Sequence, residues 1–470
     1  MAKQMELLPE HIKLFPLDDD CTLFYHTETM QLYPIGDAEI VRFLDMLHHK
    51  GKACTEICFG KTAYNNFYKP LCKLITSSPQ MSSLDIGMAS THGTRFEEVV
   101  LPISGHCTLR CPYCFAQTDG KFNFRDFEAE DIERTIDFVV EHRHAQGDKQ
   151  PLWFIFFGGE PLLRFDLICH TIQYVKEKHP NEKIYYSVTT NGTLLNDDII
   201  RLFKENKFSV LVSLDGPDNE FNLRKDEHGR SSYRRVMKFV EAMKRNGIRT
   251  ELRATMVNTN PYIVDTFAFF EQLQLPFFIS FAYASENKGH TYSHYDSELL
   301  VHIKEQFDQL EHYYRERIQN RQTIFNQRFY QFGNALRFRQ NKRIACGAAR
   351  TYFTMMADGT IFSCAHFMNN TKHAIGRVGS GTTAQAKLYR ALEIETITEC
   401  QKCWAKYLCL GHCVAQKINI GKHNDTALGE NECELERLQI AFYLKLFYYA
   451  QTLQPFAYFK KELAKEHSSC

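Results

Sequence analysis

One short loop decides how this chain folds: Gly105-His106-Cys107-Thr108-Leu109-Arg110-Cys111-Pro112-Tyr113-Cys114-Phe115. It places three cysteines in the spacing CxxxCxxC. Three thiolates on one loop suit three irons of a 4Fe–4S cube and leave the fourth iron without a protein ligand. Most electron-transfer clusters use four cysteines, so the loop predicts that another molecule binds the last iron. The spacing alone also leaves open a zinc site or a chance grouping of three cysteines.

Short apolar runs alternate with amphipathic, helix-length segments on both sides of this loop, from about residue 95 to residue 285. Six of the runs predict β-strands: 99–103, 153–157, 184–190, 209–214, 250–257 and 277–282. Six strands separated by helices favour a parallel α/β barrel, whose chemistry lies at the carboxyl ends of the strands. Polar segments follow the first four strands and begin at Cys107, Gly158, Thr190 and Ser213.

The cysteine loop, with the aromatic Tyr113 before its third cysteine, resembles that of the radical S-adenosylmethionine (SAM) superfamily. The resemblance covers roughly residues 95–285 and implies a partial (β/α)6 radical SAM barrel. It implies that Cys107, Cys111 and Cys114 hold a 4Fe–4S cluster and that SAM binds the open iron. The reduced cluster of that family cleaves SAM to a 5′-deoxyadenosyl radical.

The same resemblance implies contacts with SAM. The segment Gly158-Gly159-Glu160-Pro161 matches the part of the family that meets the SAM amino group, and Ser213 matches a position near the ribose or carboxylate. Arg224, and Arg253 in an otherwise apolar strand, are the candidates for pairing with a carboxylate. A tight strand-to-helix turn is a second reading of the glycine segment. For each arginine, the other reading is a surface salt bridge.

The tail carries a second cysteine pattern, formed by Cys346, Cys364, Cys400, Cys403, Cys409, Cys413 and Cys433. These spacings resemble the SPASM extension of radical SAM enzymes that modify peptides and proteins, which binds two auxiliary 4Fe–4S clusters. Zinc is the alternative, since paired cysteines at similar spacings also bind zinc. Together with the first loop, the resemblance implies SAM and three 4Fe–4S clusters as cofactors.

The resemblance also implies which tail cysteines belong together. Cys346, Cys364 and Cys413 match the first auxiliary cluster, whereas the second takes four ligands: Cys400, Cys403, Cys409 and Cys433. Fully ligated relatives have one more cysteine a few residues after the first, and the stretch 347–353 contains none. We therefore expect an iron of the first auxiliary cluster to be open to an external thiolate.

Residues 1–90 lack the barrel pattern. They predict a hairpin over 22–34 and helices over 37–48 and 64–75, an order that resembles the small winged-helix domain which grips precursor peptides in many peptide-modifying enzymes. A plain packing cap on the barrel is the alternative. We expect three domains: a precursor-recognition-like domain over 1–90, the radical SAM barrel over 91–330, and a SPASM domain over 331–470.

The composition of the chain limits the partners and the cellular compartment that we expect. The 470 residues include 56 basic and 56 acidic ones, so no overall charge attracts nucleic acid or an anionic membrane. The start of the chain has no signal-peptide pattern, and the apolar stretch 440–459 is interrupted by polar residues. Sixteen cysteines without a secretion signal suit a reducing compartment, where they more often bind metal. We expect a cytoplasmic protein with no nucleic-acid or membrane partner.

The predicted function is a radical SAM oxidoreductase that acts on a peptide. It would form intramolecular thioether crosslinks from substrate cysteines in a ribosomally made precursor, which is similar to the activity of sactipeptide and ranthipeptide maturases. Its expected partners are that precursor, with a leader and a cysteine-containing core, and a reducing protein such as flavodoxin or ferredoxin. No catalytic side chain is predicted.

Three alternatives remain open. The first is a formylglycine-forming anaerobic sulfatase maturase, in which an aspartate base directly follows the cysteine that matches Cys364. Here Ala365 and His366 follow instead. The second is a carbon–carbon peptide cyclase. The third is a non-catalytic iron–sulfur or zinc scaffold that binds a peptide.

Overall fold

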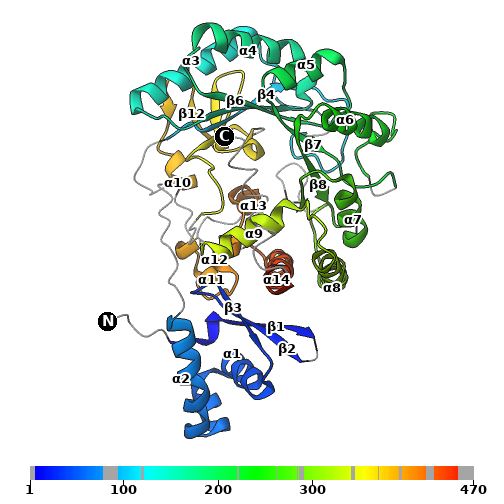
Figure 1. Cartoon of the computed structure of the whole chain (residues 1–470). Helices are drawn as coiled ribbons and strands as arrows, with labels where there is room; N and C mark the ends of the chain where they lie inside the picture. Colours follow the sequence, from blue (N-terminus) through cyan, green and yellow to red (C-terminus); the bar gives the residue numbers. More distant parts are fainter. Residues whose placement is uncertain are drawn as a thin grey trace.

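The computed structural model describes residues 6–18, 20–77, 94–117, 121–219, 222–260, 262–282, 284, 291–339, 344–368, 370–390, 394–419 and 428–453. Its centre is one large sheet, with helices on the outer face and the cysteine-rich tail on the opposite side (Figure 1). The N-terminal region, residues 6–77, lies beyond the tail. It has a hydrophobic core of its own, which includes Phe24, Phe43 and Leu47.

Six parallel strands form the middle of the sheet, in chain order: β4 (Glu98–Ser104), β5 (Leu152–Gly158), β6 (Ile184–Thr190), β7 (Ser209–Ser213), β8 (Arg249–Met256) and β9 (Phe277–Phe281). The six predicted strands are confirmed, each within one residue at either end. They are recognisable because strands covered on both faces are nearly continuous apolar runs. In β4, for example, every residue after Glu98 is buried.

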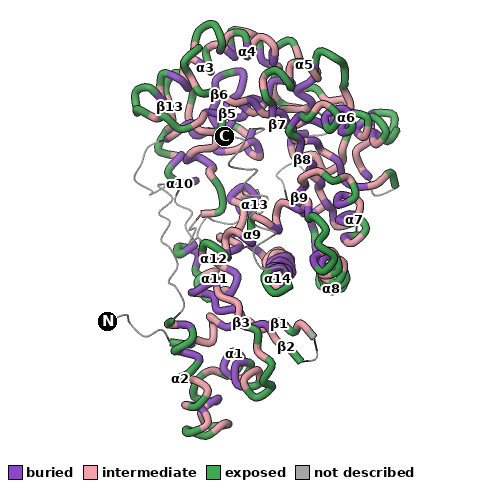
Figure 2. The backbone as a smooth tube through the Cα atoms, viewed as in Figure 1, coloured by how far each residue is buried: buried purple, intermediate pink, exposed green. Residues whose placement is uncertain are grey.

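Helices follow the strands and cover the outer face of the sheet: α3 (Ala129–Gln146), α4 (Phe165–Lys178), α5 (Asp197–Glu205), α6 (Tyr233–Arg245) and α7 (Ile263–Leu273). Each presents exposed residues outward and buried residues to the sheet (Figure 2). This arrangement directs the carboxyl ends of all six strands toward the same side, where the loops meet the tail.

Four tail strands extend the sheet beyond β4: β10 (Tyr352–Met355), β11 (Thr360–Phe362), β12 (Ala374–Arg377) and β13 (Gly381–Thr382). β10 runs parallel to β4 and forms a hairpin with β11. Gly359, with φ at +87°, makes the turn predicted at Asp358-Gly359. Because Cys346 and Cys364 flank this hairpin, the central sheet fixes the first part of the cysteine-rich tail.

The remaining helices pack below the sheet: α8 (Ser297–Gln319), α9 (Gln327–Arg337), α10 (Ala386–Arg390), α11 (Thr398–Gln401), α12 (Lys406–Cys409), α13 (Val414–Asn419) and α14 (Glu430–Leu453). The long helix α14 is largely buried (Figure 2). It packs against α8 through Phe442 and Phe307, whose ring centroids are 5.4 Å apart. In the described part of the chain, no helix combines the length and apolar character that a membrane crossing requires.

The N-terminal region contains a three-stranded antiparallel sheet and two helices: β1 (Ile12–Asp18), β2 (Cys21–His26), β3 (Gln31–Ile35), α1 (Ala38–Phe59) and α2 (Lys61–Ser77). The predicted hairpin and both predicted helices are present, and α1 and α2 extend beyond the predicted bounds. Asp37 caps α1, because its carboxylate accepts hydrogen bonds from the amides of Glu39 at 2.8 Å and Ile40 at 3.2 Å. The strand β1 was not predicted.

One face of this small sheet docks on the tail around Trp404. The Trp404 ring lies 5.4 Å from the Phe15 ring and 6.3 Å from the Tyr25 ring, centroid to centroid. Beside them, a Glu28 carboxylate oxygen lies 2.6 Å from the Lys406 ammonium. These contacts fasten the N-terminal region to the segment that carries Cys403 and Cys409.

The Glu28–Lys406 pair gives a testable pH dependence. Burial alone would raise the pKa of Glu28, but the hydrogen bond and the charge of Lys406, together with His11 and the Tyr407 hydroxyl, outweigh it and the pKa is lowered. A carboxyl whose folded pKa is depressed adds stability above its unfolded pKa, and this stability is lost as pH falls through the folded pKa. We expect Glu28→Gln to lower the free energy of unfolding by about 2 kcal/mol at neutral pH.

The loss should shrink as the pH falls below about 4. Urea unfolding of wild type and Glu28→Gln across this pH range measures it. A difference that stays constant with pH would contradict the role given to the ion pair.

Candidate active site

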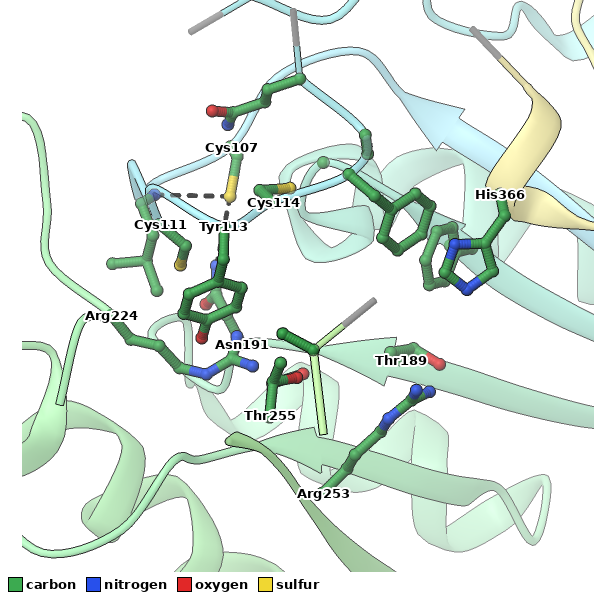
Figure 3. A pocket seen from close by; sticks show the side chains of 18 of the residues that line it. Cys107, Cys111, Tyr113, Cys114, Thr189, Asn191, Arg224, Arg253, Thr255 and His366 are labelled. Carbon is green, nitrogen blue, oxygen red and sulfur yellow. Dashed lines mark hydrogen bonds between the residues drawn. The ribbon is translucent and has the colours of Figure 1, made fainter. Parts of the chain in front are cut away.

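A cavity lies where the carboxyl ends of the parallel strands meet the tail (Figure 3). The cysteine loop after β4 forms one wall, and strand ends from β6 to β9 form another. The side chains labelled in Figure 3 are Cys107, Cys111, Tyr113, Cys114, Thr189, Asn191, Arg224, Arg253, Thr255 and His366. The structure thus brings all three cysteines of the loop to one cavity.

Two amide groups support the first thiol. The Leu109 backbone amide donates to Cys107 Sγ at 3.4 Å, and the Asn191 side-chain amide donates to the same sulfur at 3.5 Å. Burial raises the pKa of Cys107 to about 11 and the pKa of Cys111 to about 12. Because the Cys114 thiol adds to both shifts, the three sulfurs lie close enough to interact. Buried thiols with raised pKa values gain most from a metal that binds them as thiolates.

The three thiols of the loop fit a 4Fe–4S cube, which gives each cysteine an iron of its own, so that its thiolates surround a volume. Within the described ranges, no group of three or more His, Cys, Asp or Glu side chains is arranged around one metal position.

Gly158, the last residue of β5, and Gly159 let the backbone pack directly against the cysteine loop. The Gly159 amide donates to the Ser104 carbonyl and the Glu160 amide to the His106 carbonyl, both at 2.7 Å. A Cβ on Gly158 would lie 2.4 Å from the Ser104 oxygen, and one on Gly159 would lie 2.1 Å from the His106 oxygen. Any larger residue would therefore push the loop away, and both glycines line the cavity.

Glu160 is hydrogen-bonded to the end of β6, and the SAM contact that the resemblance implies for it stays a prediction. Its carboxylate is fully buried and accepts hydrogen bonds from Thr190 Oγ1 at 2.7 Å, the Asn191 amide at 2.7 Å and the Leu162 amide at 3.1 Å. Burial raises its pKa to about 7. Glu160 thus holds the end of β6, and neither it nor Pro161 is among the residues that line the cavity.

Arg224 also lines the cavity, but it has a protein partner. Its Nε lies 3.0 Å from Asp215 Oδ1, and its guanidinium lies 5.6 Å from the Tyr113 ring centroid. Asp215 further accepts hydrogen bonds from the Tyr113 hydroxyl and, at 3.0 Å, from the Thr255 amide. The arginine is therefore part of a buried ion-paired cluster, and the surface salt bridge left open as its alternative is wrong. The pairing with Asp215 was not predicted.

Ser213 and Arg253 lie opposite each other on the neighbouring strands β7 and β8, and both line the cavity. The Arg253 guanidinium lies 5.2 Å from the Phe278 ring centroid. Figure 3 shows Arg253 on the same side of the cavity as His366. Burial, and then the charge of Arg253, lower the pKa of His366 to about 4, so the imidazole is neutral near pH 7.

His366 comes from the tail and was not predicted as a site residue. It lies in a short 3-10 helix, η3 (Ala365–Phe367), directly after Cys364. Its ring packs on Phe115 of the cysteine loop, with centroids 4.1 Å apart. Its place two residues after a predicted ligand was the only available signal. The tail thus supplies one wall of the cavity.

The tail cysteines influence one another's pKa values in two sets, and the cluster membership that the resemblance implies for them stays a prediction. Burial raises the pKa of Cys364, and Cys413 and Cys346 raise it further. In the other group, burial raises the pKa of Cys433 to about 12; the Arg437 guanidinium opposes this shift, while Cys400 and Cys403 add to it. Burial, and then Glu436 and these thiols, also raise the pKa of Cys409. Iron ligation by either group remains a prediction.

Comparison with known proteins gives consistent matches. The model of the Radical SAM superfamily matches residues 101–269. The cysteine-type anaerobic sulfatase-maturating enzyme of Clostridium perfringens is 27% identical over 338 residues, which cover 67% of this chain and 88% of that protein. The serine-type anaerobic sulfatase-maturating enzyme of Bacteroides thetaiotaomicron is 29% identical over 212 residues, 44% of this chain and 50% of that protein.

Two solved structures share the fold. Native anSMEcpe with bound AdoMet has a TM-score of 0.63 at 20% identity, over 76% of this chain and all of that one. Streptococcus suis SuiB bound to the precursor peptide SuiA has a TM-score of 0.53 at 16% identity, over 91% of this chain and 99% of that one. Identities this low establish similarity of fold alone.

A glycine-to-alanine substitution, which adds one methyl group, tests the close contact between Gly159 and the cysteine loop. We expect Gly159→Ala to lower the free energy of unfolding by about 3 kcal/mol, because its Cβ would overlap the His106 carbonyl. Gly36→Ala is the matched control, since its Cβ would make an ordinary 3.4 Å contact with the Asp20 carbonyl. Urea unfolding under reducing conditions compares the two. Equal losses would show that the approach of β5 to the cysteine loop is not as close as described.

Proposed function

Because residues 101–269 match the model of the Radical SAM superfamily, we propose that this chain is a radical SAM enzyme that modifies a peptide. The observation that carries the proposal is the cavity in which Cys107, Cys111 and Cys114 face Gly158 and Gly159. The three cysteines would hold a 4Fe–4S cluster, and SAM would occupy the cavity beside it. A cluster bound there supplies the electron that cleaves SAM to a 5′-deoxyadenosyl radical.

The chain's own residues prepare this site. The amides of Leu109 and Asn191 stabilise the Cys107 thiolate, and Gly158 and Gly159 allow a ligand to approach the backbone. Arg253, which lines the cavity, is a candidate partner for the SAM carboxylate, and Arg224 is paired with Asp215. Ser213, opposite Arg253, offers a hydroxyl to the ribose or carboxylate.

Relatives support a peptide substrate. The C. perfringens and B. thetaiotaomicron relatives are named as sulfatase-maturating enzymes. The SuiB structure holds the precursor peptide SuiA, and another structure of anSMEcpe holds AdoMet and a Kp18Cys peptide. For this chain we propose a ribosomally made precursor with a leader and a cysteine-containing core, and flavodoxin or ferredoxin as electron donor.

The proposed reaction is thioether formation. A substrate carbon loses a hydrogen atom to the 5′-deoxyadenosyl radical, and a carbon–sulfur bond forms with a substrate cysteine. The thiol proton goes to solvent and the surplus electron returns to the redox partner, so the product is lighter by two hydrogens. The group of Cys346, Cys364 and Cys413 supports this reaction, because three cysteines leave one cluster position for a substrate thiolate.

Sulfatase maturation is the second candidate, and it is favoured by the names of the relatives that match most of their length. The residues that follow Cys364 do not fit this candidate. Where those enzymes are expected to carry an aspartate base after the cysteine, this chain has Ala365, and the neutral His366 ring packs on Phe115.

Iron content and SAM cleavage test the first step. We expect about twelve irons per reconstituted chain, four for each cluster. Replacing Cys107, Cys111 and Cys114 by Ala should remove about four of them and abolish 5′-deoxyadenosine formation with dithionite. Cys58→Ala is the control, since that thiol is exposed and belongs to neither tail group. Wild-type rates of SAM cleavage in the triple variant would refute the radical SAM site.

Product mass tests the second step. Cys346→Ala and Cys413→Ala should still release 5′-deoxyadenosine, because SAM lies in the other site, but should give no product lighter by two hydrogens. Mass spectrometry of the precursor measures this loss. Full crosslinking by these variants, or equal modification of a cysteine-free precursor, would exclude the thioether reaction and favour a carbon–carbon cyclase.

A further inference from the structure

A buried lysine lies between the two sets of tail cysteines. The first set is Cys346, Cys364 and Cys413, and the second set is Cys400, Cys403, Cys409 and Cys433. Lys417 belongs to the short helix α13, and only 1% of its surface is exposed. Its amide donates to the Cys413 carbonyl at 3.2 Å, which joins the helix to the first set. Lysine is almost never buried this deeply unless it has a partner.

A small cavity shows what Lys417 faces. Lys417 and Cys346 line this cavity together. Residues 410–412, which connect the second set to the first along the chain, line it as well. Ile397 also lines it, and the Ile397 carbonyl accepts a hydrogen bond from the Cys400 amide at 3.1 Å. The cavity therefore lies where the segments that carry the two sets meet, and Lys417 is buried at this junction.

The charge of Lys417 acts on one cysteine of each set. Burial, followed by neighbouring thiols, raises the pKa of Cys413 and raises the pKa of Cys400 to about 11. The Lys417 ammonium opposes both of these shifts. Arg350 opposes the raised pKa of a thiol in the first set, and Arg437 does so in the second. Lys417 thus places one positive charge within reach of both sets.

A fixed positive charge favours the more negative of two redox states. A 4Fe–4S cluster gains one negative charge when it is reduced, and its potential depends on nearby charge, hydrogen bonds to sulfur and solvent exposure. Because Lys417 is buried, water and salt screen its charge much less than they screen a charge at the surface. A cation at the junction of two clusters should therefore stabilise an added electron on either one.

We propose that Lys417 tunes the two tail clusters together: its ammonium stabilises the reduced state of both, so that the tail accepts the surplus electron of the peptide reaction. The inference rests on the proposed function, which assigns a cluster to each set and leaves one electron over when the carbon–sulfur bond forms. That electron leaves the substrate for the tail and then passes to flavodoxin or ferredoxin, so no further oxidant is needed. Lys417 itself neither gives nor takes a proton.

A redox titration followed by electron paramagnetic resonance tests this role on the full-length chain. The triple variant in which Cys107, Cys111 and Cys114 are Ala is the background, since it should keep the tail clusters alone. There, Lys417→Met removes the charge and keeps a long side chain. It should make the reduction of both clusters about tenfold less favourable, which lowers each one-electron midpoint by about 59 mV. Lys417→Arg should keep both midpoints of the background.

Gln416→Met is the matched control, since Gln416 is the neighbouring residue of α13, is also buried and carries no charge. It should leave both midpoints unchanged. Iron analysis should give about eight irons per chain in every variant. If Lys417→Met lost this iron, Lys417→Gln would replace it in the titration with the same expected shift. No shift, a shift of one cluster alone, an equal shift in Gln416→Met, or a shift that Lys417→Arg also shows would overturn the proposal.

SAM cleavage without peptide, measured on protein that keeps all its cysteines, reports separately on the proposed function, because Lys417 does not line the cysteine cavity. Shifted midpoints without any SAM cleavage would leave the role of Lys417 standing and remove the radical function. Zinc in the tail, with no signal to titrate there, would overturn the role of Lys417. SAM cleavage by the same preparation would then leave the radical SAM site standing.

Discussion

The site depends on one close backbone contact, between the glycines at the end of β5 and the loop that carries the first three cysteines. The Gly159 and Glu160 amides donate to carbonyls of Ser104 and His106, and no side chain intervenes. A chain of hydrogen bonds connects this contact to the first cysteine. The Glu160 carboxylate fixes the Asn191 amide at the end of β6, and the Asn191 side chain donates to Cys107 Sγ. Glu160 therefore links the glycine segment to the residue that donates to Cys107, whether or not it also touches a ligand.

The sequence was most informative where local pattern and burial agree. The six central strands were predictable because parallel strands buried on both faces are short apolar runs, each ended here by polar residues. The turn at Gly359 was predictable because a tight turn needs a positive φ. β1 was missed: Pro16 weakens its strand pattern, and only its edge position makes a proline acceptable there.

The side-chain partners at the site were much less predictable. Arg224 and Asp215 lie nine positions apart in the connection between β7 and α6, and no local pattern indicates that one neutralises the other. His366 reaches the cavity only because β10 and β11 join the central sheet beside β4 and carry the following residues across to Phe115. Such pairings follow from sheet order, which depends on long-range packing. The assignment of ten cysteines to clusters rests on their spacing in the sequence and stays a prediction.

The contact around Trp404 has a consequence for how the protein is made. Thr27 donates a hydrogen bond to the Trp404 carbonyl, a contact between residues 377 positions apart. Ribosomes add about 5–20 residues per second, so the N-terminal sheet emerges roughly 20–75 s before its partner exists. During that time Phe15 and Tyr25, both buried in the finished protein, face solvent or a chaperone. The N-terminal sheet, although it is synthesised long before Trp404, thus reaches its final surroundings only after that residue is made.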